Sequence, residues 1–113
     1  MWLFTQHGFY SIVADRTRSG RHLLRARVRH DLENLIELAA LEATILHTPS
    51  ADYIYRISID AADLVRVMHV RATTVDYPNF KGRIAKLDDQ AARSANYHHI
   101  WAEAARIPDS SAH

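Results

Sequence analysis

One stretch of this chain, residues 22–29, alternates apolar side chains with Arg25, Arg27 and Arg29. Successive side chains of a β-strand point to opposite faces, so this alternation predicts a strand with one apolar face and one face of three guanidiniums. The apolar face must pack against other elements. The arginine side is then left open to solvent or to an anionic partner.

Three other stretches have the composition of strands. They are rich in aromatic and β-branched residues and span 2–14, 44–48 and 53–59. Gly8 interrupts the first, which we expect to bend there. The polar segment 15–20 then predicts a hairpin loop that leads antiparallel into the arginine strand.

Three segments show helical spacing of apolar residues. Asp31 stands at the position of an N-cap and predicts a helix over 31–43. A second helix is expected from Asp60 or Ala61 to the irregular segment DYPNFKG, because a proline disfavours helical geometry in the residue before it. A third is expected over 88–106.

The predicted order is ββαββα followed by a C-terminal helix, which indicates the α+β class. A strand, a helix, two strands and a helix match the split βαβ arrangement of a ferredoxin-like sheet. The first strand would extend that sheet at its edge, giving four strands, mostly antiparallel, in a circularly permuted ferredoxin-like topology with both helices on one face. We expect a single domain over 1–108 and a disordered tail over 109–113.

Composition restricts the functional classes. The chain of 113 residues has no cysteine and three glycines, which excludes thiolate chemistry and glycine-rich phosphate loops. No apolar run reaches the roughly 20 residues that span a bilayer, so we expect a cytoplasmic protein without membrane contact. Six arginines face Asp15 alone in residues 1–30, whereas 31–65 hold seven acidic residues and one arginine. Such segregation favours self-association, and we expect a homodimer.

The opening MWLFTQHGFYSIV and the later DYPNFK resemble corresponding segments of a small, widespread family of bacterial proteins with no assigned activity. The resemblance covers most of the chain. It implies no catalytic residue, cofactor or partner.

The open face of the predicted sheet would bring the three arginines of residues 22–29 beside Arg56. Guanidiniums at this density repel one another unless an anion compensates them, so we expect an acidic protein surface or single-stranded nucleic acid as partner. Binding of RNA by a four-stranded sheet also uses aromatic side chains on the central strands. Alternation places Tyr53 and Tyr55 on the face opposite Arg56. The N-terminal aromatics Trp2, Phe4, Phe9 and Tyr10 are expected in the core or at a subunit interface.

The segment DYPNFKG is the part of the chain that periodicity does not explain. It predicts either a chain reversal locked by two packed aromatics or a binding loop. Its candidate contact residues are Tyr77, Asn79, Phe80 and Lys81.

Two alternative functions remain open at this stage. A small inhibitor of a nucleic-acid-handling complex, of the anti-CRISPR kind, fits the size and the missing catalytic motif. His99 and Glu103 lie one helical turn apart and would serve a small metal-dependent enzyme if the fold supplied a third ligand. No other spacing indicates a metal, a cofactor or a nucleophile, so a protein without enzymatic activity is favoured.

Overall fold

The computed structural model describes residues 1–109, and its contacts form two compact units, residues 1–76 and residues 77 onward. The single domain expected over 1–108 stays a prediction, and the expected tail lies almost wholly outside the described residues. No helix within residues 1–109 has the length and apolar character needed to cross a membrane.

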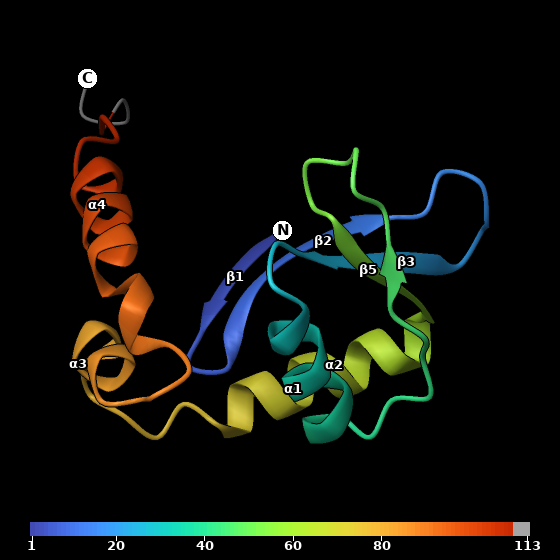
Figure 1. The fold of residues 1–113 in the computed structure, drawn as a ribbon, viewed down its shortest axis with the longest axis horizontal. Coiled ribbons are helices and arrows are strands. Elements are labelled where there is room, and N and C mark those ends of the chain that lie inside the picture. The colour runs from blue at the N-terminus through green and yellow to red at the C-terminus, as the bar shows by residue number, and fades with distance from the viewer. Residues whose placement is uncertain (110–113) are drawn as a thin grey trace. The chain divides into compact units, whose positions relative to one another are not determined.

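The first unit is built on a five-stranded antiparallel sheet (Figure 1). Its strands are β1 (Trp2–Thr5), β2 (Gly8–Ala14), β3 (Arg21–Ala26), β4 (Leu46–His47) and β5 (Tyr55–Asp60), in the spatial order β1-β2-β3-β5-β4. The α+β class and the pairing of β3 with β5 are as predicted. The strand count is not, because the stretch expected as one bent strand folds back on itself. The ferredoxin-like topology and its permutation stay predictions.

The reversal between β1 and β2 is held by polar contacts. Thr5 Oγ1 accepts hydrogen bonds from the backbone N–H groups of His7 and Gly8, at 3.2 and 3.1 Å. The backbone N–H of Phe9 donates to Asp31 Oδ2 at 3.1 Å. Asp31 is not the predicted N-cap, because the helix already begins at Arg29. It is buried in the first turn of that helix and holds the hairpin against it.

Helices α1 (Arg29–Leu38) and α2 (Ala61–Thr73) pack on the same face of the sheet and form the core with it (Figure 1). The buried side chains on the sheet side are Tyr10, Ile12, Leu24, Ala26, Ile57 and Ile59, and those on the helices include Leu32, Leu35 and Val67. Helix α2 begins where the sequence predicted, and the Asp60 side chain caps it by accepting from the Asp63 N–H at 2.8 Å.

Helix α1 ends earlier than position 43, where the apolar spacing had predicted its end. The N–H of Leu41 donates to the carbonyl of Ile36 at 2.9 Å, and the N–H of Ala40 donates to that of Glu37 at 3.3 Å. This pair of bonds is the Schellman motif, which terminates a helix through one residue in the left-handed region. Ala40 takes that conformation, with φ of 50°.

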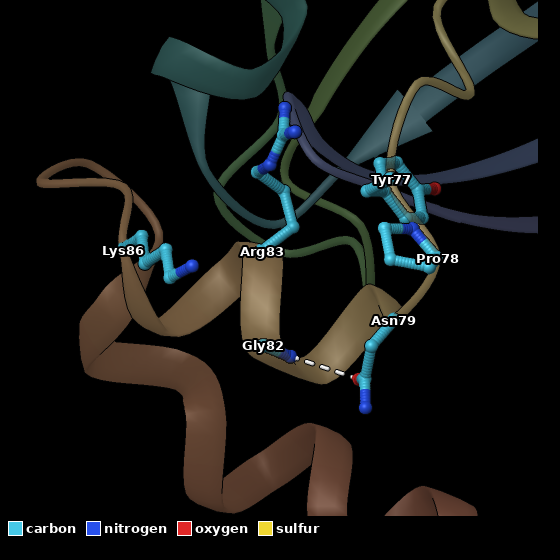
Figure 2. A pocket seen from close by; sticks show the side chains of 6 residues that line it. All are labelled: Tyr77, Pro78, Asn79, Gly82, Arg83 and Lys86. Carbon is cyan, nitrogen blue, oxygen red and sulfur yellow. Dashed lines mark hydrogen bonds between the residues drawn. The ribbon is translucent and has the colours of Figure 1, made fainter.

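The second unit contains α3 (Phe80–Ala85), the 3-10 helix η1 (Ala91–Arg93) and α4 (Ser94–Ala104). The helix predicted over 88–106 is thus shorter and begins with a tighter turn. The segment DYPNFKG is not irregular throughout, because Asn79 starts α3. Its side chain accepts a hydrogen bond from the Gly82 N–H at 3.0 Å, as the dashed line in Figure 2 shows.

Candidate anion-binding face

The sheet face that α1 and α2 leave uncovered carries one continuous cross-strand row. Residues paired directly across neighbouring strands share a face. Trp2 pairs with Ser11, Ser11 with Arg25, Arg25 with Arg56, and Arg56 with Leu46. The row crosses all five strands, and its two arginines lie on β3 and β5.

Arg25 and Arg56 are neighbours without an acidic counterpart. Like charges directly opposite each other in a sheet repel. Among residues 1–76, no carboxylate lies within 4.0 Å of either guanidinium. The Nε–H groups of both arginines are buried and donate to no atom of that unit. The fold therefore holds two adjacent cations whose charge it does not neutralise.

Both guanidiniums are nevertheless held in place by neutral groups. Arg25 Nη2 donates to Ser11 Oγ at 2.8 Å, and Arg56 Nη2 donates to the carbonyl oxygen of Tyr53 at 3.2 Å. These bonds fix the side chains without cancelling their charge. They leave the other Nη–H donors of both guanidiniums for another acceptor, whereas the Nε–H groups are buried.

The buried ring of Tyr53 packs against two of the arginines. Tyr53 is 7% exposed, and the Cζ atoms of Arg25 and Arg27 lie 4.8 and 4.5 Å from its ring centre. Contacts of this kind are worth about 0.5–2 kcal/mol each. The predicted placement of Tyr53 opposite the arginines is wrong, because β5 begins at Tyr55 and alternation does not extend back to residue 53.

The predicted row of three arginines is shorter than the sequence pattern indicated. Strand β3 ends at Ala26, so Arg27 follows the strand and Arg29 is the first residue of α1. Arg27 forms an exposed ion pair with Asp52, N to O 3.0 Å, and this hydrogen bond raises the pKa of Arg27.

Sequence reasoning missed Arg21, which begins β3 on the same face as Arg25. Its Nε and Nη2 donate to the hydroxyl and carbonyl oxygens of Ser58, both at 3.0 Å. Arg21 precedes Arg25 by four residues, an even spacing that would have placed it on the same face of an extended strand. The structure thus defines an arginine face, which consists of Arg21, Arg25, Arg27 and Arg56.

A groove of about 610 Å³ opens on this face. Its floor comes from the strands and its wall from the loop after β2; the lining residues are Val13, Ala14, Asp15, Arg16, Thr17, Leu23, Arg25 and Arg56. Asp15 is its single carboxylate. Hydrogen bonds from the backbone N–H and the hydroxyl of Thr17, both 2.9 Å, lower the pKa of Asp15. Three arginines against one aspartate leave the groove cationic.

Three aromatic side chains lie beside the arginine face on β1 and β2. Phe4 and Phe9 stack with ring centres 4.4 Å apart and planes 4° apart, and Trp2 stands edge-on to both at 6.5 and 6.2 Å. We call Trp2, Phe4 and Phe9 the aromatic cluster. Phe9 also lies 6.2 Å from the Tyr53 ring. Of the four N-terminal aromatics expected in the core or at an interface, only Tyr10 lies in the core.

The four candidate contact residues of DYPNFKG divide between two roles in the second unit. Tyr77 and Asn79 line a cavity of about 130 Å³ with Arg83 and Lys86 (Figure 2). Phe80 instead lies 5.5 Å from the Tyr97 ring, and Lys81 lies 4.0 Å from the Trp101 ring. The last two pack α3 against α4, and the choice between a chain reversal and a binding loop stays a prediction.

The helical pair His99 and Glu103 is exposed on α4. Within residues 1–109, no group of three histidine, aspartate or glutamate side chains is placed to hold a metal ion. No family model matches the chain, and neither a curated protein nor a solved structure matches it. Function is therefore inferred from the chemistry of the arginine face.

Proposed function

We propose that this chain is a non-enzymatic binding protein that engages an anionic partner through the arginine face. The observation that carries the proposal is the Arg25–Arg56 pair, two arginines at directly paired positions that line one groove with no carboxylate from residues 1–76 within ion-pair distance. Their repulsion is a standing cost to the free protein. A bound anion removes that cost and accepts hydrogen bonds from the Nη–H groups that do not donate to Ser11 or to the Tyr53 carbonyl.

The geometry suits partners that bear phosphate or carboxylate groups. A guanidinium offers five donors in a planar fork that matches phosphate and carboxylate oxygens. Immobilising a flexible side chain on binding costs about 0.5–1.5 kcal/mol. Much of that cost is already met here, because Arg25 and Arg56 are tethered before any partner arrives. The groove runs over the sheet surface beside them and contributes Arg16 as a further cation.

The proposal is tested by the salt dependence of binding to a short labelled oligothymidylate and to inorganic polyphosphate. Replacing Arg25 and Arg56 together by Gln removes two phosphate contacts. The slope of log K against log salt for the oligonucleotide should then flatten by about 1.4, because each contact with a single strand contributes about 0.7. The affinity at low salt should fall with it.

The matched control is Arg29→Gln with Arg66→Gln. It removes the same net charge from the helical layer, where Arg29 begins α1 and Arg66 pairs with Asp63 on α2. The control variant should retain the wild-type slope. The proposal is wrong if the wild type binds neither polyanion in a salt-dependent way, or if the control loses as much affinity as the Arg25 and Arg56 variant.

A further inference from the structure

The aromatic cluster continues the arginine face across the sheet. Trp2, Ser11 and Arg25 occupy successive strands of the same register row, so Trp2 and Arg25 are two strand spacings, about 10 Å, apart. The Phe9 ring lies 6.2 Å from the rings of both Trp2 and Tyr53, and the guanidiniums of Arg25 and Arg27 lie over the Tyr53 ring. Aromatic rings and guanidiniums therefore form a single surface.

This surface is exposed where apolar side chains are ordinarily covered. Trp2 is 65% exposed, and Phe4 and Phe9 are half-buried. The edge-on tryptophan packs against both stacked phenylalanines, which restricts the positions that the indole can take on the edge strand β1. Fixed aromatic rings bind planar ligands with little loss of conformational entropy.

We infer that the anionic partner is single-stranded nucleic acid, with unpaired bases stacked on the aromatic cluster and phosphates on Arg25 and Arg56. This inference rests on the proposed function and narrows it. A nucleotide joins a planar base to a phosphate, which matches a surface that joins rings to guanidiniums. A duplex holds its bases stacked inside the helix and offers only phosphates to a flat face. An acidic peptide offers carboxylates without a stacking group.

Tryptophan fluorescence tests the inference in the intact chain. The chain has two tryptophans, and Trp101→Phe leaves Trp2 as the only reporter, whereas Trp2→Phe leaves Trp101. Trp101 is similarly exposed, at 56%, and lies on α4. Oligothymidylate should quench Trp2 and leave the emission of Trp101 unchanged. Equal quenching of both, or none of Trp2, would contradict the inference.

Affinity measurements separate this inference from the proposed function. An abasic oligonucleotide of equal length keeps every phosphate, and it should bind about five-fold or more weakly than oligothymidylate, since a single stacked base contributes at least about that factor in affinity. Trp2→Leu should reduce oligothymidylate binding by a similar factor and leave abasic binding unchanged, whereas Trp101→Leu should change neither.

Each remaining outcome has a defined meaning. If abasic and natural strands bind equally and with the same salt dependence, the arginine face binds phosphate backbones and the base-stacking inference is wrong. If a duplex or a polyglutamate peptide binds as tightly as the single strand, the partner belongs to that other class. If no polyanion binds, both the inference and the proposed function are wrong. If Trp2→Leu does not fold, quenching in Trp101→Phe and Trp2→Phe and abasic binding by the wild type still test the base-stacking inference.

Discussion

Replacement of Gly8 by alanine should destabilise the first unit strongly, because Gly8 lies against a buried carboxylate. A Cβ atom at this position would stand 2.5 Å from Asp31 Cγ and 2.8 Å from the Tyr10 hydroxyl oxygen. Both neighbours are buried, at 1% and 0% exposure, so neither is a flexible end that can turn away. The Gly8 φ of +156° adds backbone strain.

The expected loss of stability has two sources, steric overpacking and a broken hydrogen bond. Forcing an extra methyl group into a packed interior costs about 1–3 kcal/mol. Displacing Asp31 also breaks its charged hydrogen bond with the Phe9 N–H, worth about 1.5–3 kcal/mol. The expected loss is therefore about 3–5 kcal/mol, a large part of the roughly 5–15 kcal/mol that a domain possesses.

Urea denaturation provides the measurement, and Gly20→Ala the matched control. Gly20 has a positive φ of 75° but no atom within 4 Å of an added Cβ, so its replacement costs backbone strain of about 1 kcal/mol and nothing more. At a typical slope of about 2 kcal/mol per molar urea, Gly8→Ala should move the midpoint by about 2 M and Gly20→Ala by about 0.5 M. Equal shifts for the two variants would refute the packing argument.

Two further predictions concern local conformation and pH. Ala40→Gly should stabilise the first unit by about 1 kcal/mol in the same urea assay, because Ala40 takes the left-handed conformation at the end of α1, where glycine is unstrained; a loss of stability would contradict the Schellman assignment. The pKa of Asp15 is lowered in the folded state, so its contribution to stability is complete above its ordinary value of 3.8 and disappears as pH falls through the folded pKa. As the pH falls from 5 to 2, the free energy of unfolding of the Asp15→Asn variant should decrease less than that of the wild type. Equal decreases in the two proteins would contradict this.

Sequence alternation predicted what depends on local geometry. It assigned Arg25 and Arg56 to the uncovered face, and the proposed strand order placed them on neighbouring strands; the register confirms both. It failed where regular structure ends, because alternation carries no information beyond the last residue of a strand. Tyr53 precedes β5 and Arg29 follows β3, and both were assigned by extending the pattern too far.

Other differences arise from contacts between residues distant in sequence. Aspartate is a common N-cap residue, and its place before the apolar helix pattern predicted a cap at Asp31. In the folded chain Asp31 instead accepts a hydrogen bond from the N–H of Phe9, 22 residues earlier, and this contact is not visible in the sequence. Gly8 likewise indicated a bend, while the approach of Asp31, which leaves no room for a Cβ atom there, is visible only in the folded chain.

Several expectations from the sequence stay predictions. They are the homodimer, the cytoplasmic location, the inhibitor alternative, the metal-dependent alternative at His99 and Glu103, and membership of the bacterial family that the segments MWLFTQHGFYSIV and DYPNFK resemble. Light scattering tests the first directly. Metal analysis of the purified protein tests the fourth.

The central claim is that Arg25 and Arg56 form an anion-binding pair, and NMR observation of the arginine Nε–Hε signals during a titration with oligothymidylate tests it most directly. The signals of Arg25 and Arg56 should shift first and together, with saturation at the same ligand concentration, while those of Arg29 and Arg66 stay in place. Shifts that spread evenly over all the arginines, or that leave Arg25 and Arg56 unmoved at saturation, would contradict the claim.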